Sequence, residues 1–249
     1  MTASLSACTT DLATVPEVLL GAPRADSFTA FGRRVDIWVA EIDAPAGADS
    51  LRSGELISAV DAERAARIGA PGGRARFTAG RALARWALAA HLGCLPTEVP
   101  MVTGIGGRPE LAVVRRSLLT RGQAYEGIDF NLSHSGNQVA VAVARGLRVG
   151  IDIERVIERD NTHDLASRVF SAAERELLMC TSTAGYLARW YQIWTTREAY
   201  VKAQGTGLSG IAAELPDPGT SWLAHAVRGV AQGYAATVVA YRKDCRRAG

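Results

Sequence analysis

Short segments of alternating apolar and polar residues run through this 249-residue chain. Val35, Ile37 and Val39 recur at every second position, with Asp36 and Ala40 on the opposite face, which is the period of a half-buried β-strand. The turn dipeptide Arg145-Gly146 favours a hairpin between the strands on either side of it. No clear period precedes residue 30, and that part is interpreted as a variable lead-in. Strands are predicted at 35–42, 130–133, 139–144, 149–154 and 234–241.

Helical periodicity predicts three longer helices. The first covers 58–68, and the second runs from Arg74 to about residue 92, where Gly93 provides a C-cap. The third covers 185–203 and ends at Gly205. A break is predicted at Pro71-Gly72-Gly73, and the glycine-rich stretch 103–109 (TGIGGRP) is predicted to be a loop. Ser171 followed three residues later by Glu174 is the pattern of a capping box at the start of a further helix.

Strands, hairpins and helices occur in both halves of the chain. This distribution predicts an α+β protein with two similar lobes. The N-terminal lobe is placed at 1–125 and the C-terminal lobe at 126–249.

Composition narrows the functional classes. Apolar residues make up 48% and charged residues 21%, which is typical of a globular protein and not of a disordered one. No apolar run is long enough to cross a membrane, and the net charge of +3 is too small to favour a nucleic-acid partner. No basic region precedes an apolar run at the N-terminus, so we expect no secretory signal. The four cysteines are widely spaced, which predicts a cytoplasmic protein without a disulfide framework or zinc site; they are Cys8, Cys94, Cys180 and Cys245.

Basic residues gather in one stretch that contains arginine and no lysine. Guanidinium groups form bidentate bonds to phosphate, so an anion site is one interpretation. A solvated helix face is the other, and the residues alone favour it. The stretch comprises Arg64, Arg67, Arg74, Arg76, Arg81 and Arg85.

Three motifs carry candidate chemistry. In Gly150-Ile151-Asp152-Ile153-Glu154 the two carboxylates share one face of a strand. One interpretation is that they are hard oxygen ligands for Mg²⁺. The other is that they form a solvent-exposed acidic face of an edge strand. Glu198 and Lys202 lie four residues apart on a helix rich in aromatic residues, as a functional pair or a surface ion pair. His134 lies at the end of a strand, between Ser133 and Ser135. A Ser-His-Asp hydrolase could use such residues, but the sequence contains no GxSxG nucleophile elbow.

These motifs occur in a fixed order: GRP, FNLSHS, GIDIE, FSxxE and WTTREAYVKAQGTGLS. In that order they resemble the 4′-phosphopantetheinyl transferases, specifically the longer surfactin-type class, and the resemblance covers Arg64 to Ser209. It implies the fold of that family and transfer of the phosphopantetheine arm of coenzyme A to a serine of an acyl or peptidyl carrier protein. It also implies a monomer that serves polyketide, nonribosomal peptide or fatty acid synthesis.

The resemblance implies a role for each motif residue. Asp152, Glu154 and Glu198 would hold Mg²⁺ on the diphosphate of coenzyme A. Glu198, directly or through a water, would deprotonate the carrier serine. Lys202 would stabilise or protonate the leaving 3′,5′-adenosine diphosphate. The residues expected to bind coenzyme A phosphates are Arg64, Arg67, Arg76, Arg108, Ser133 and His134.

Two departures and two alternatives stay open. Arg108 and Arg197 stand where the family often carries lysine, and Pro71–Gly73 has the character of an insertion. Glu174 is interpreted as a helix cap rather than a catalytic group. An inactive relative that only binds carrier proteins is one alternative function. A metal-dependent hydrolase of coenzyme A or of phosphopantetheinyl carrier protein is the other.

Overall fold

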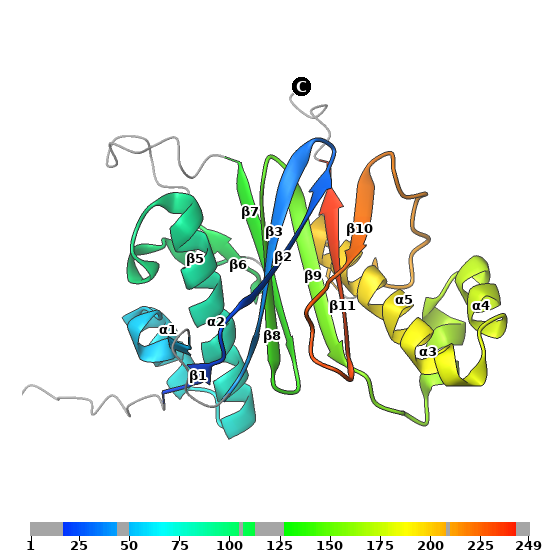
Figure 1. Ribbon diagram of the computed structural model, residues 1–249, viewed down its shortest axis with the longest axis horizontal. Coiled ribbons are helices and arrows are strands. Elements are labelled where there is room, and N and C mark those ends of the chain that lie inside the picture. Colours follow the sequence, from blue (N-terminus) through cyan, green and yellow to red (C-terminus); the bar gives the residue numbers. More distant parts are fainter. Residues whose placement is uncertain (1–16, 44–49, 105–106, 113–126, 208–209, 243–249) are drawn as a thin grey trace, which may run out of the picture.

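The computed structural model describes residues 17–43, 50–104, 107–112, 127–207 and 210–242. Within these ranges the chain forms five α-helices and eleven strands (Figure 1). The helices are α1 (Ala59–Ala66), α2 (Pro71–Leu92), α3 (Thr162–Val169), α4 (Ala172–Met179) and α5 (Thr183–Gln204). The strands are β1 (Leu19–Leu20), β2 (Arg24–Ala30), β3 (Arg33–Glu41), β4 (Leu51–Arg52), β5 (Met101–Thr103), β6 (Pro109–Leu111), β7 (Ile128–Ser135), β8 (Gln138–Arg145), β9 (Arg148–Arg155), β10 (Trp222–Ala226) and β11 (Tyr234–Tyr241).

Two antiparallel sheets form the centre of the molecule. The first has the order β2-β3-β8-β7 and the second the order β10-β11-β9. The short pairs β1-β4 and β5-β6 stand apart from them. Figure 1 shows the sheets side by side, with α1 and α2 on the outer side of the first and α3, α4 and α5 on the outer side of the second. The α+β class predicted from the sequence is confirmed.

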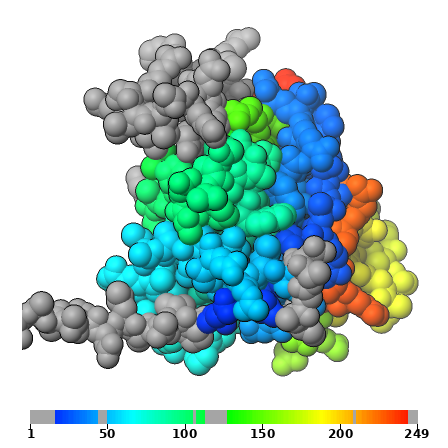
Figure 2. Space-filling view, turned by 60° about the vertical axis from the view of Figure 1, so that its left-hand side comes forward, coloured from blue at the N-terminus to red at the C-terminus, as the bar shows by residue number. Residues whose placement is uncertain are grey.

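Strand β8 explains why the layers stack in this way. Its side chains alternate between valine on one face and alanine on the other, and all except Arg145 are buried. The valines at 139, 141 and 143 contact the core around α2, whereas the small alanines at 140, 142 and 144 face the second sheet. A strand that is buried on both faces therefore joins two cores. Figure 2 shows the outer side of the first layer, where the cyan residues of α1 and early α2 adjoin the green residues that follow α2.

Most predicted elements are confirmed, and four details are corrected. Residues 24–30 are not a lead-in, because they form β2 and pair with β3. The predicted hairpin around Arg145-Gly146 is absent: β8 pairs with β3 and β7, while β9 pairs with β11 in the other sheet. The second helix begins at Pro71 rather than after it, because proline at the first helical position gives up no hydrogen bond. Thr103 and Pro109 are paired in β5 and β6, so only the middle of that stretch is a loop.

Some predictions concern residues outside the described ranges. Ile105 and Gly106 of the predicted loop lie there, as do Cys8, Cys245 and Ser209. The predicted lobe boundary between residues 125 and 126 lies there too. Two strands of the first sheet precede that boundary and two follow it. In the described part of the chain no helix has both the length and the apolar character needed to span a bilayer.

Candidate active site

A close contact between β9 and α5 brings the GIDIE and WTTREAYVK motifs together. Gly150 makes the contact possible, because a Cβ atom there would lie 1.9 Å from the Ala199 carbonyl oxygen. Asp152, two residues along β9, thereby lies opposite the turn of α5 that carries Glu198 and Lys202. With Glu154, which lies further along β9, four candidate residues from two distant motifs lie near this contact.

The ammonium group of Lys202 is the centre of the polar contacts. Its Nζ atom donates to Asp152 Oδ1 at 2.6 Å and to Ser133 Oγ at 3.2 Å. The Ser133 hydroxyl itself donates to Asp152 Oδ1 at 3.0 Å. Asp152 is 3% exposed, and its other oxygen, Oδ2, is buried without a hydrogen-bond partner. One carboxylate oxygen is thus held by two donors, while the other remains available to a further ligand.

Negative charge is concentrated around Asp152. Burial raises the pKa of Glu154, and the Asp152 charge raises it further. Burial likewise raises the pKa of Glu198, again with a contribution from Asp152. Lys202 opposes both shifts but does not cancel them. The three carboxylates therefore repel one another in a partly desolvated site, and an added cation would relieve that repulsion.

The donor chemistry of this site suits a magnesium ion. Carboxylate oxygens are the protein ligands that Mg²⁺ prefers, and the unpartnered Asp152 Oδ2 is such an oxygen. Over the described ranges, however, no three His, Cys, Asp or Glu side chains stand close enough to enclose a metal. In the structure the Lys202 ammonium group occupies the position beside Asp152. The residues present fit the ion by chemistry, although their side chains are arranged around Lys202.

His134 and Arg76 form a second part of the site, in which Arg76 carries a positive charge. His134 lies on β7 next to Ser133 and close to Gly80 of α2. The residue is exposed overall, yet partial desolvation of its ring lowers the pKa of His134, and the charges of Arg76 and Lys202 lower it further. Arg76 has no hydrogen bond or ion pair among the described residues, so its guanidinium group is available to an anion.

The other predicted arginines are placed differently. Arg64 extends from α1 to the hydroxyl of Thr103 and lies over the ring of Phe77, 5.6 Å from its centroid. The exposed Arg67 makes a same-helix ion pair with Glu63. Arg64 and Arg76 thus lie on neighbouring helices, whereas Arg67 is held by a neighbour on the surface of α1.

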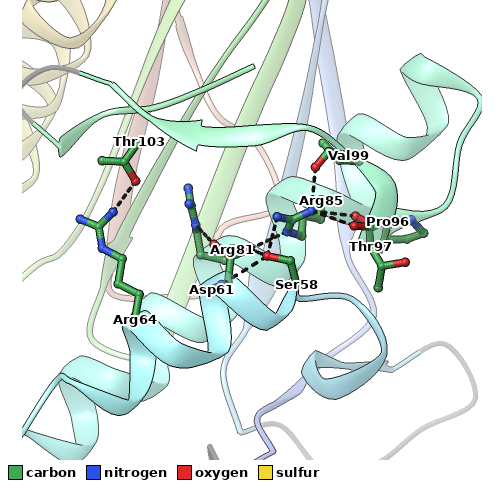
Figure 3. Close-up of polar contacts among 9 residues, drawn as sticks. All are labelled: Ser58, Asp61, Arg64, Arg81, Arg85, Pro96, Thr97, Val99 and Thr103. Carbon is green, nitrogen blue, oxygen red and sulfur yellow. Dashed lines mark hydrogen bonds and ion pairs between the residues drawn. The ribbon is translucent and has the colours of Figure 1, made fainter. Parts of the chain in front are cut away.

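Two further arginines of the same stretch are structural. Arg81 and Arg85 of α2 point at the buried carboxylate of Asp61, with Nε–oxygen distances of 2.7 and 2.6 Å (Figure 3). Ser58 caps α1 and also contacts this group, donating to Asp61 Oδ2 and accepting from Arg85. Arg85 donates in addition to the carbonyl oxygens of Pro96, Thr97 and Val99. The interpretation of the stretch as a solvated helix face is wrong for these two residues.

Arg108 is surrounded by protein acceptors. Its guanidinium group donates to the carbonyl oxygens of Lys202, Phe130 and Val149 and forms an ion pair with Asp129. The contact with Lys202 joins the GRP loop to the helix that carries the candidate catalytic residues. A phosphate bound to Arg108 would compete with these bonds. The phosphate contact predicted for Arg108 stays a prediction.

Sequence reasoning identified the cap formed by Glu174 but not its second role. The Glu174 carboxylate accepts from the backbone N–H of Ser171, which confirms the capping box. It also pairs with Arg197, whose side chain is 1% exposed, at 2.6 Å. Sequence reasoning also missed Ser135, whose hydroxyl donates to Glu154 Oε2 at 2.8 Å. Polar residues at alternate positions along β7 were the available signal.

Comparisons with known proteins address the family to which the chain belongs. Residues 148–229, which include the acidic motif and all of α5, match the model of the 4′-phosphopantetheinyl transferase superfamily. The 4′-phosphopantetheinyl transferase HetI of Nostoc sp. (strain PCC 7120) is 33% identical over 192 residues, covering 75% of each chain. The chain belongs to the 4′-phosphopantetheinyl transferase superfamily.

Other relatives in the superfamily are similar over shorter ranges. The 4′-phosphopantetheinyl transferase AcpT of Salmonella typhi is 35% identical over 158 residues, or 63% of this chain and 70% of the relative. A 4′-phosphopantetheinyl transferase of Bacillus subtilis is 35% identical over 86 residues, which are 34% of this chain and 37% of the relative. Membership of the superfamily, predicted from the ordered motifs, is confirmed.

Proposed function

We propose that this protein transfers 4′-phosphopantetheine from coenzyme A to a serine of an acyl or peptidyl carrier protein and releases 3′,5′-adenosine diphosphate. The meeting of Asp152, Glu154, Glu198 and Lys202 at the contact of β9 with α5 carries the proposal. Superfamily membership supports the reaction itself. The carrier would belong to polyketide, nonribosomal peptide or fatty acid synthesis.

Each residue at the contact has a place in this reaction. Asp152, Glu154 and Glu198 would hold Mg²⁺, which when bound neutralises the charge of the coenzyme A diphosphate. Glu198 accepts the proton of the carrier serine, and the serine oxygen forms its bond to the β-phosphorus. As the bond from that phosphorus to the bridging oxygen breaks, the Lys202 ammonium group neutralises the leaving phosphate. Lys202 is half-buried, which strengthens this electrostatic effect.

The phosphates of coenzyme A would lie on the face formed by β7, α1 and α2. His134 is proposed to contact the 3′-phosphate from β7, and Arg76 is the adjacent cation with no other ion pair in the described ranges. Ser133 belongs to the same predicted set, although its hydroxyl bonds to Asp152 and Lys202 in the structure. Arg64 would approach from α1. Arg67 and Arg108 belong to the same predicted set, although protein groups bind both of them in the structure.

The broader predictions belong to the same proposal. The chain is proposed to act as a cytoplasmic monomer without a nucleic-acid or membrane partner. Its two lobes, 1–125 and 126–249, are proposed to be related by a pseudo-twofold axis. The 22-residue helices α2 and α5, one on the outer side of each sheet, support that relation.

Intact-mass spectrometry tests the function. An apo carrier protein incubated with coenzyme A, Mg²⁺ and this protein should gain the mass of one phosphopantetheine group. A carrier whose acceptor serine is replaced by alanine is the control and should gain nothing. No gain on any of several acyl and peptidyl carriers would refute the transferase, as expected for a binding protein without activity. Loss of phosphopantetheine from a holo carrier would favour the hydrolase instead.

A further inference from the structure

One edge of β9 has no backbone partner among the described strands. Its other edge pairs with β11 from residue 148 to residue 155. On the unpaired edge, the backbone N–H groups of alternate residues point towards β7. A buried N–H group without an acceptor is costly, and an open strand edge presents a whole row of them.

Side chains of β7 satisfy this edge. Alternate residues of β7 each place one oxygen on the N–H group of a β9 residue, at distances of 2.8 to 3.3 Å. Both strands advance by two residues at each step, so the strands run parallel and the side chains replace a hydrogen-bonded backbone. We call this set the side-chain ladder. Its four pairs are Asp129 with Val149, Asn131 with Ile151, Ser133 with Ile153, and Ser135 with Arg155.

The two serines of the ladder also reach the acidic motif. Ser133 Oγ donates to Asp152 Oδ1 at 3.0 Å, and Ser135 Oγ donates to Glu154 Oε2 at 2.8 Å. A serine hydroxyl that accepts a hydrogen bond from a backbone N–H group can still donate its single proton to one acceptor. Each serine gives it to a carboxylate on β9. The ladder therefore fixes both the register of β9 and the orientation of its two carboxylates.

We propose that Ser135 is a positioning residue, which holds the Glu154 carboxylate in the orientation it needs to act together with Asp152 on a cation. The inference rests on the proposed function. Ser135 is the better of the two serines to test, because Lys202 also contacts Ser133. Among the described residues, Ser135 Oγ contacts only Glu154 and the N–H group of Arg155. A glutamate side chain loses considerable rotational freedom when it is fixed, and a partner that fixes it in advance strengthens metal binding.

The test compares Ser135→Ala, Ser135→Thr and the matched control Ser167→Ala. Ser167 is exposed on α3, and its hydroxyl bonds only to the Asp164 carbonyl oxygen of the same helix. Mn²⁺ affinity is measured by calorimetry with coenzyme A present, and the Mg²⁺ concentration for half-maximal transfer is measured separately. For Ser135→Ala we expect both to weaken by about 10- to 100-fold, the usual effect of removing a partner of a metal ligand. Ser135→Thr keeps the hydroxyl, so it should stay within about threefold of wild type, as should Ser167→Ala.

A merely structural role gives a different pattern. Asn131→Ala removes a ladder bond that touches no carboxylate. If Ser135→Ala and Asn131→Ala lower the melting temperature alike while Mn²⁺ affinity in Ser135→Ala equals that of wild type, the positioning role is refuted. If Asn131→Ala does not fold, a wild-type Mn²⁺ affinity in Ser135→Ala is enough to refute the positioning role. If wild type itself binds no Mn²⁺ and transfers nothing, the proposed function fails and the inference fails with it.

Discussion

Replacing Asp61 by asparagine should strongly destabilise the folded protein. The Asp61 carboxylate is 1% exposed and faces two guanidinium groups, those of Arg81 and Arg85, which are 5% and 2% exposed. Asp61→Asn keeps the size of the side chain but removes the only negative charge bonded to these two cations in the described ranges. Breaking a buried ion pair by removing one partner costs about 3–5 kcal/mol, because a charge remains without compensation. We expect the free energy of unfolding to fall by that amount.

Urea unfolding followed by circular dichroism measures this change. Asp160→Asn is the matched control: Asp160 is exposed, and its replacement should shift the free energy of unfolding by no more than about 0.5 kcal/mol. A loss below about 1 kcal/mol for Asp61→Asn would refute the reasoning, because that is the range of an exposed ion pair.

The pH dependence provides a second check on Asp61. Burial alone would raise the pKa of Asp61, but the nearby arginine charges and hydrogen bonds outweigh burial and hold the pKa below its usual value. A carboxyl group with a lowered folded-state pKa stabilises the protein above its unfolded-state pKa, which is about 3.9. That stabilisation is lost as the pH falls through the folded-state value. The difference in stability between wild type and Asp61→Asn should therefore be constant near neutral pH and shrink below about pH 4. A difference that does not change with pH would contradict the ion-pair account.

Three other substitutions test the contact of β9 with α5. Gly150→Ala should abolish transfer and lower the melting temperature, because the new Cβ would overlap the Ala199 carbonyl; wild-type rates would show that the contact is not needed. Arg108→Lys keeps the charge but not the fork of hydrogen bonds, so we expect kcat and stability to fall while KM for coenzyme A changes less than about threefold. A selective rise in KM would instead support the predicted phosphate contact. Lys202→Ala should reduce mainly the rate of the chemical step in single-turnover assays and affect coenzyme A binding less, whereas a loss confined to coenzyme A binding would assign Lys202 to substrate binding.

The sequence predicted which residues form the site better than it predicted the contacts between them. The alternation in the GIDIE motif and the spacing of Glu198 and Lys202 are local patterns, so their elements could be assigned directly. The ion pair of Lys202 with Asp152 joins residues 50 positions apart and depends on the absence of a side chain at Gly150. Periodicity within one segment contains no information about such a contact.

The errors have the same physical origin. The turn at Gly146 suggested that β8 and β9 pair, but the alanine face of β8 lets the two sheets stack there instead. Arg81 and Arg64 looked equivalent in sequence. Only the fold distinguishes them, because Arg81 is buried against Asp61 and Arg64 extends to the exposed Thr103. Which arginines serve an anion therefore depends on which carboxylates the fold brings within reach.

The most direct test of the central claim compares wild type with Asp152→Ala on one apo carrier protein, with Asp160→Ala as the matched control. Intact-mass spectrometry follows the phosphopantetheine mass gain, and circular dichroism confirms that each variant is folded. The account predicts complete modification by wild type and Asp160→Ala and no modification by folded Asp152→Ala. Modification by Asp152→Ala at the wild-type rate would contradict the assignment of the reaction to this site.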